Sequence, residues 1–156
     1  MTSANDSAAA LTTEYVTVTV GDHLFGLPIF RVQDVFVPDR LTPVPLAPPE
    51  VAGILNLRGR VVTAIDMRAR LDLGARQPGT PAMAIGIELK GESYGLLVDA
   101  VGEVMALRNS ACEEKPTNLD PRLSRVAAGI YRLEGQLMVV LDVDRVLDIR
   151  NSAVAA

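Results

Sequence analysis

The chain has 156 residues and a formal net charge of −4 at pH 7, and its 49% hydrophobic and 22% charged residues are typical of a globular domain that buries its own core. A negative net charge with only 4% aromatic residues excludes the basic, stacking surface that nucleic-acid binding requires. No apolar run approaches the roughly 20 residues of a membrane span, and a single cysteine, Cys112, excludes an internal disulfide and favours the cytoplasm.

The beginning of the chain predicts a tail followed by a strand hairpin. Residues 1–13 are rich in Ala, Ser and Thr without periodicity, which predicts a flexible tail. Polar and apolar residues then alternate from Thr13 to Val20, and this period of two indicates a strand. Gly21-Asp22 predicts a turn, after which residues 23–27 form the returning strand.

A connector, a strand and a short helix are predicted next. Four prolines between residues 43 and 49 cannot donate backbone hydrogen bonds, so this stretch is expected to be an extended connector. β-Branched residues from Arg60 to Ile65 indicate a strand. Asp66 is expected to cap a short helix that ends with Gly74 as its terminating glycine.

The second half predicts similar elements. Residues 82–89 and 93–98 favour a hairpin around Lys90-Gly91-Glu92. Residues 136–141 predict another strand, and Asp142 is expected to cap an amphipathic helix that continues to Arg150. Residues 151–156 are predicted to form a loose C-terminal tail.

The two halves repeat one plan. Phe25-Gly26-Leu27 matches Tyr94-Gly95-Leu96 at an offset of 69 residues, and the pattern G-I-x-x-L-x-G recurs at an offset of 76. The second half therefore carries seven additional residues, which fall in the polar stretch between Leu107 and Arg125. Such a repeat indicates one architecture used twice, here two small barrels of short strands. The pairs expected on equivalent elements include Gly59 with Gly135 and Asp66 with Asp142.

The order of these motifs resembles the CheW family of chemotaxis coupling proteins. The stretch Gly-Ile-Leu-Asn-Leu-Arg-Gly-Arg-Val-Val at residues 53–62, closed by Ile65-Asp66, is similar to the family signature. Residues 26–29 (Gly-Leu-Pro-Ile) and 32–35 (Val-Gln-Asp-Val) precede it, and the second half agrees in the same order. The resemblance covers about residues 14–149.

The resemblance implies a mainly β fold. It implies one domain over residues 14–150, with two SH3-like five-stranded β-barrel subdomains related by a pseudo-twofold axis, short helices and a C-terminal helix. The first subdomain is expected at about residues 21–74 and the second at about 82–141, with the terminal segments completing the barrels.

The resemblance also implies a non-catalytic adaptor without cofactor or metal. The implied partners are the regulatory domain of a CheA-like histidine kinase and the cytoplasmic tips of chemoreceptors (methyl-accepting chemotaxis proteins). The chain is expected to be a monomer when isolated, cytoplasmic, and recruited to membrane receptor arrays. The receptor-binding positions of the family, in a groove between the subdomains, fall on Ile29, Val32, Asp34, Gly53 and Arg58.

Two of these positions carry opposite charges. We predict that Asp34 and Arg58 meet across the groove in a partly exposed ion pair. The repeat places Glu134 at the position of Arg58, so the shared architecture does not require arginine there, which favours a binding role. Strand alternation predicts that Val32 and Asp34 share one face while Val35 packs inside.

Other functions have weaker support in the sequence. The only histidine, His23, lies beside a predicted turn without the partners of a catalytic triad, and Cys112 stands next to two glutamates. The repeated positions of Asp66 and Asp142 favour helix caps over a catalytic carboxylate pair. The main alternative to an adaptor is a ligand-sensing β-barrel module without kinase coupling, and a small hydrolase is the third.

Overall fold

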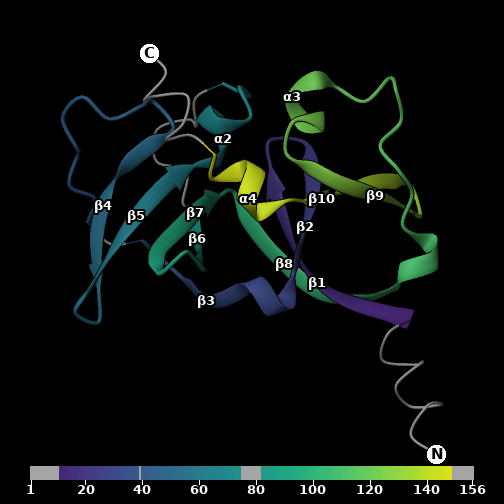
Figure 1. Cartoon of the computed structure of the whole chain (residues 1–156), viewed down its shortest axis with the longest axis horizontal. Coiled ribbons are helices and arrows are strands. Elements are labelled where there is room, and N and C mark those ends of the chain that lie inside the picture. The colour runs from purple at the N-terminus through teal and green to yellow at the C-terminus, as the bar shows by residue number, and fades with distance from the viewer. Residues whose placement is uncertain (1–10, 39, 75–81, 149–156) are drawn as a thin grey trace, which may run out of the picture.

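The computed structural model describes residues 11–38, 40–74 and 82–148, in which two five-stranded sheets lie side by side (Figure 1). In strand order, sheet A consists of β8 (Ala100–Arg108), β1 (Thr12–Val20), β2 (His23–Pro28), β10 (Gln136–Leu141) and β9 (Ala127–Leu133). Sheet B consists of β3 (Val32–Phe36), β6 (Met83–Leu89), β7 (Glu92–Val98), β5 (Arg60–Asp66) and β4 (Val51–Leu57). The expected mainly β fold is confirmed.

The helical elements are all short. They are the 3-10 turns η1 (Ile29–Arg31) and η2 (Asn109–Ala111) and the helices α2 (Met67–Arg70), α3 (Pro121–Ser124) and α4 (Val143–Val146). Within the described part of the chain, none of them is long and apolar enough to cross a membrane. The helix predicted after Asp142 ends at Val146, and its predicted end, Arg150, lies outside the described residues.

The internal repeat is confirmed by the sheet order. Reading both sheets from the same end places β8 with β3, β1 with β6, β2 with β7, β10 with β5 and β9 with β4. The middle strand of each sheet has a parallel neighbour in the same register, because Gly26 pairs with Val140 and Gly95 pairs with Ala64. Gly59 and Gly135 both occupy left-handed conformations in the equivalent turns, with φ of 84° and 81°.

The first hairpin of each half is exchanged between the sheets. β1 and β2 join β8, β9 and β10 in sheet A, whereas β6 and β7 join β3, β4 and β5 in sheet B. The predicted subdomain ranges, 21–74 and 82–141, therefore do not coincide with the sheets. The reason is that the chain crosses between the sheets twice. It leaves β2 through η1 and enters sheet B at β3, and it leaves β7 and enters sheet A at β8.

The ends of the chain also differ in detail from the prediction. Thr12 and Thr13 pair with Arg108 and Leu107 in sheet A, so the first strand begins inside the predicted tail of residues 1–13. Residues 1–10 and the predicted C-terminal tail, 151–156, lie outside the described residues.

The largest core lies between the two sheets. It contains buried residues from both, including Val18 and Phe25 of sheet A and Ile85 and Leu96 of sheet B. Each sheet also covers a smaller apolar cluster on its opposite face, because side chains alternate along a strand: Leu97 joins the cluster of sheet B, although its neighbour Leu96 joins the shared core. The corresponding cluster of sheet A includes Tyr15, Tyr131, Met138 and Val140.

The helices after β5 and β10 begin at the predicted caps. The Asp66 carboxylate accepts the backbone N–H groups of Arg68 and Ala69, and Asp142 accepts those of Asp144 and Arg145. The predicted end at Gly74 is wrong, because Leu71 already closes α2 and Asp72 takes the left-handed conformation with φ of 56°. Aspartate tolerates that conformation better than most residues, so glycine is not needed there.

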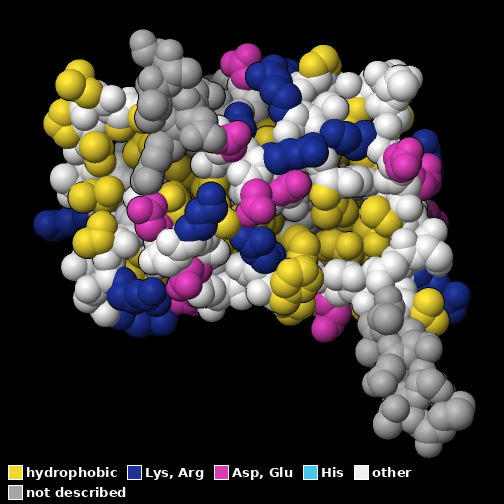
Figure 2. Space-filling view, in the orientation of Figure 1, with side chains coloured by type: hydrophobic (Ala, Val, Ile, Leu, Met, Phe, Trp, Pro, Cys, Tyr) yellow, Lys and Arg dark blue, Asp and Glu magenta, His cyan; other side chains and the backbone are white. Residues whose placement is uncertain are grey.

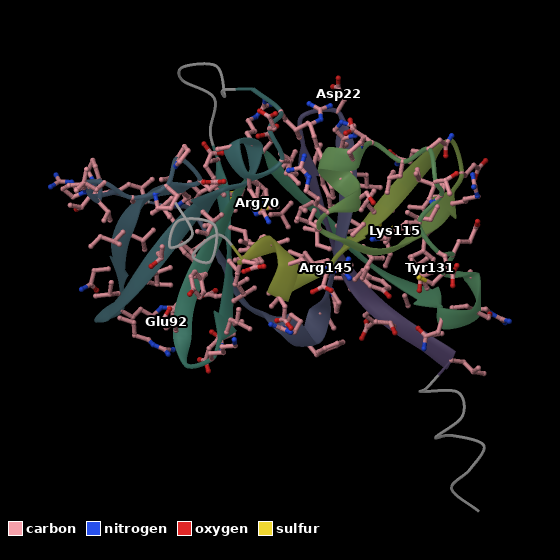
Figure 3. The ribbon with its side chains drawn as sticks, turned by 45° about the horizontal axis from the view of Figure 1, so that its top comes forward. Asp22, Arg70, Glu92, Lys115, Tyr131 and Arg145 are labelled. Carbon is pink, nitrogen blue, oxygen red and sulfur yellow. The ribbon has the colours of Figure 1, made fainter. Side chains whose placement is uncertain are left out.

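The two capped helices meet at the centre of the molecule, where Figure 3 shows Arg70 beside α4. Its Nε donates to the carbonyl of Val146 at 2.8 Å and its Nη2 to the carbonyl of Arg145 at 2.8 Å. Carbonyls at a helix C-terminus have no partner within the helix and carry partial negative charge, so a guanidinium stabilises them. Arg70 therefore fixes the helix of one repeat against that of the other.

Candidate functional site

A hollow of about 350 Å³ opens on the outer face of sheet B. We name it the first hollow. Apolar side chains of the small cluster of sheet B, such as Phe36, Leu57 and Val62, form part of its lining, together with polar and charged residues. The remaining lining residues are Gln33, Asp34, Arg58, Arg60, Gly86, Ile87 and Ser93.

The predicted ion pair between Asp34 and Arg58 is confirmed in this hollow. Arg58 Nη1 lies 3.1 Å from Asp34 Oδ2, and the other carboxylate oxygen of Asp34 accepts the backbone N–H of Val35 at 2.9 Å. The Arg58 side chain remains 76% exposed, whereas that of Asp34 is 28% exposed. A pair this exposed contributes only about 0–1 kcal/mol to folding. Its geometry instead presents a fixed guanidinium, most of whose surface faces outward.

The β4–β5 turn explains why the arginine lies there. Arg58 and Gly59 have φ of 54° and 84°, the pair of positive values that a tight type I′ hairpin turn needs. The Asn56 side chain accepts the backbone N–H of Gly59 at 2.8 Å, which stabilises the turn. Because the turn projects from the end of the hairpin, its arginine reaches over the hollow toward β3.

The rim of the hollow also includes residues that sequence reasoning missed. Glu88 on β6 lies 3.6 Å from Arg60 on β5, and it accepts the side-chain N–H of Gln33 on β3 at 3.3 Å. Glu88 comes from the other half of the chain and reaches this rim because the hairpins are exchanged. The repeat offsets alone carried no signal for that contact.

Val32 and Asp34 lie on opposite faces of β3, so the predicted shared face is wrong. The pairing of β3 with β6 shifts between these residues: Val32 pairs with Ile87, but Asp34 pairs with the next residue along, Gly86. This bulge inserts one residue and reverses the alternation. Val32 consequently packs against the shared core, while Val35, expected inside, is 39% exposed.

The remaining two predicted positions lie elsewhere. Ile29 is on η1, next to Phe30, whose side chain is 77% exposed and was not singled out from the sequence. Gly53 is a buried residue of β4 against the connector, where Thr42 exchanges two backbone hydrogen bonds with Ile54. Hence the first hollow brings together Asp34 and Arg58, and it is lined by sheet B alone, not by a groove between the sheets.

Gly53 has a packing role that the structure makes explicit. Its φ of 154° favours glycine, and a Cβ at this position would come within 2.7 Å of the Thr42 carbonyl oxygen. At the corresponding glycine of the second half, Gly129, an added Cβ would likewise come within 2.8 Å of Cys112 Sγ in its connector. Both glycines therefore let a connector pass close to an outer strand.

The residues considered for catalysis have structural contacts. Asp66 and Asp142 bind helix N–H groups, and no group of three or more potential metal ligands occurs within the described ranges.

Tyr131 has a shifted pKa for a structural reason. Burial is the main cause, and a hydrogen bond with Tyr15 adds to it; both raise the pKa of the Tyr131 hydroxyl above its usual value. Tyr131, seen in Figure 3, is 2% exposed and belongs to the apolar cluster of sheet A.

Comparisons with known proteins agree on one family. The family described as "CheW: CheW-like domain" matches residues 14–151. Similar relatives are the chemotaxis protein CheW of Rhizobium meliloti (strain 1021), 31% identical over 85% of this chain and 86% of the relative, and that of Bacillus subtilis (strain 168), 27% identical over 82% of each. The crystal structure of the scaffolding protein TtCheW from Thermoanaerobacter tengcongensis superposes with a TM-score of 0.75 and 29% identity, covering 85% of this chain and 90% of the other.

Proposed function

Because the chain belongs to the family of CheW-like domains, we propose that it is a chemotaxis scaffold that couples chemoreceptors to a histidine kinase. The observation that carries the receptor half of this proposal is the Asp34–Arg58 pair over the first hollow. An arginine whose guanidinium group is oriented by one carboxylate and stays largely exposed is suited to bind carbonyl or carboxylate oxygens of a partner.

The receptor site in this proposal has Arg58 and Asp34 at its centre. The receptor's cytoplasmic tip would contact the exposed guanidinium and the apolar lining of the first hollow. Ile29 adds a partly exposed apolar side chain on η1. Val32 and Gly53 would act indirectly, because Val32 packs on the shared core and Gly53 holds the connector close to β4.

The kinase would bind a second, apolar surface of sheet B. Figure 2 shows hydrophobic side chains along the left rim, over β4 and the connector that precedes it. The exposed members include Val37, Leu46 and Val61, at 70%, 104% and 64% exposure. Val37 and Val61 line an open depression of about 400 Å³, together with Ile54 and Leu57. A surface of this kind, apolar at its centre, is typical of protein interfaces.

The remaining features of the proposal follow from the same family membership. The protein would act without catalysis, as a monomer when isolated, in the cytoplasm, and would be recruited to receptor arrays at the membrane. Residues 14–150 would form one functional domain, since each sheet contains strands from both halves. A ligand-sensing module without kinase coupling is not favoured, because the similar proteins are named for chemotaxis and scaffolding.

A three-component capture experiment tests this function. A kinase regulatory domain is immobilised, a soluble receptor tip fragment is added, and receptor retention is measured with and without the protein. We expect receptor to be retained only when the protein is present. An Arg58→Ala variant should still bind the kinase domain but retain little receptor, whereas equal retention with and without the protein would refute the coupling role.

A further inference from the structure

The first hollow has a counterpart on sheet A. A second hollow, of about 480 Å³, opens there beside β8 and the β9–β10 turn. Every residue that lines it is the repeat partner of a residue that lines the first hollow, at the offsets of 69 or 76 residues. Among these pairs, Met105 corresponds to Phe36 and Leu133 to Leu57, so both hollows have apolar side chains in their lining.

The two hollows differ in their charges. Glu103 takes the position of Asp34, which preserves the carboxylate, but Glu134 takes the position of Arg58, which reverses the charge. The first hollow thus supplies its own guanidinium, at 3.1 Å from its acid. Both carboxylates of the second hollow are exposed, and neither has an ion-pair partner among the residues that the structure describes.

We propose that the second hollow binds an arginine side chain of a partner protein, which takes the place that Arg58 fills in the first hollow. The evidence is the geometry of the first hollow, in which the same architecture holds a guanidinium against the equivalent acid. An arginine suits both parts of the site, because its stem can pack on Leu24, Met105 and Leu133 while its fork meets the two glutamates.

The backbone around the hollow fits an extended segment. β8, which carries Glu103, is an outer strand of sheet A, so one of its edges has no neighbouring strand within the sheet. Outer strands can accept an extended peptide through main-chain hydrogen bonds, with side-chain pockets giving specificity. The proposed ligand is therefore an extended segment with an arginine flanked by apolar residues. This site is independent of receptor binding at the first hollow.

Peptide binding to the full, isotope-labelled chain tests the proposal. The probe is the capped peptide Gly-Leu-Arg-Val-Gly, and its control has citrulline, which is neutral and nearly isosteric, in place of arginine. We expect the arginine peptide to shift the backbone amide resonances of β8 and the β9–β10 turn, with the citrulline peptide binding roughly tenfold more weakly. Affinity for the arginine peptide should also fall as salt is raised.

Three variants decide where the peptide binds. Glu134→Arg copies the first hollow by supplying an internal guanidinium, and it should abolish peptide binding while leaving the melting temperature unchanged. The double variant Glu103→Gln/Glu134→Gln should weaken binding roughly tenfold, whereas Asp144→Ala, which removes an exposed carboxylate outside both hollows, should leave it unaltered. The proposal is overturned if neither glutamate variant weakens binding, if the resonances that move belong to the first hollow, or if the glutamate variants instead change self-association, which would make a second copy of the chain the occupant.

Discussion

Arg68 at the start of α2 forms a two-pronged ion pair with Asp99, which lies between β7 and β8: Nε and Nη2 of the guanidinium are 3.1 and 2.7 Å from Oδ1 and Oδ2. Oδ2 of Asp99 also accepts the backbone N–H of Gly21, in the β1–β2 turn, at 2.7 Å. The hydrogen bond from Arg68 to Asp99 raises the pKa of the guanidinium above its usual value. One mostly buried carboxylate thereby ties a turn of sheet A to a helix that follows sheet B.

Removal of the arginine should therefore destabilise the whole domain. We expect Arg68→Ala to lower the free energy of unfolding by about 2–3 kcal/mol, because Asp99 would lose two charge-assisted hydrogen bonds in a largely buried place. Asp99→Ala should cost at least as much, since Gly21 also loses its acceptor. Urea unfolding followed by circular dichroism measures both.

The repeat supplies a matched control for this prediction. Asp144 holds the position of Arg68 in the second half, at the offset of 76, and pairs with Arg31 at 3.6 Å with far more exposure. Asp144→Ala should change stability by less than about 0.5 kcal/mol. An Arg68→Ala variant as stable as this control would show that the buried pair does not hold the sheets together.

Acid should weaken the cap of α3. Arg122 donates side-chain hydrogen bonds to Asp120, and these, with the bond from its own backbone N–H, lower the pKa of that carboxyl from 3.8 to about 2. A carboxyl whose pKa is lower in the folded state stabilises the fold above its unfolded pKa and loses this effect as the pH falls through the folded value. The melting temperature of Asp120→Asn should therefore lie below that of the parent at neutral pH.

The same linkage gives the pH profile. The difference in melting temperature between the parent and Asp120→Asn should be constant above about pH 5 and shrink steadily toward pH 2. Calorimetry across this range measures it. A difference that stayed the same down to pH 2 would mean that the charge of Asp120 is not what stabilises the cap.

Local features of this fold could be predicted because a few neighbouring residues determine them. The carboxylates of Asp66 and Asp142 bind N–H groups only two and three residues ahead. Gly59 and Gly135 supply the positive φ that their four-residue turns require. The Asp34–Arg58 pair could also be predicted, because opposite charges at two positions of one family site suggested that the two side chains meet.

Features that depend on distant pairing could not be predicted in this way. The exchange of hairpins is decided by which strands pair across some 70 residues of sequence, and the periodicity of β1 or β6 is the same in either sheet. Likewise, the bulge between Val32 and Asp34 reverses a face by inserting one residue, and nothing in the alternation of β3 signals it. The second hollow became visible only when the repeat was placed on the structure.

The proposed kinase surface can be tested by placing a charged side chain within it and measuring kinase binding. Val61→Glu and Val37→Glu should weaken kinase binding by roughly tenfold or more, since each would bury a carboxylate in an apolar contact. Surface plasmon resonance with the kinase regulatory domain measures this, and the affinity of the parent should vary little with salt. Val104→Glu makes the same change on β8, outside the surface, and should bind normally. Equal losses for all three would place the interface elsewhere.

Gly53 should be sensitive to substitution for reasons of packing alone. We expect Gly53→Ala to destabilise the fold by about 1–3 kcal/mol, because its Cβ would meet the Thr42 carbonyl and its φ of 154° disfavours other residues. Gly59→Ala also faces a positive φ, of 84°, but has nothing within 4 Å, so it should cost about 1 kcal/mol or less. Thermal melting compares them. If Gly53→Ala melts like the parent yet fails to bind receptor, the glycine contacts the receptor directly.

Arg58 gives the most discriminating test of receptor binding, because it can be removed without unfolding the protein. Its pair with Asp34 is exposed, so Arg58→Ala should melt within a few degrees of the parent and keep its kinase affinity, while its receptor affinity falls by roughly tenfold or more. Arg58→Lys should restore little, since an ammonium lacks the planar fork. Asp34→Lys should be worse than Asp34→Ala, because it sets two cations together. Parent-like receptor binding by Arg58→Ala, measured beside its melting curve, would remove the ion pair from the receptor site.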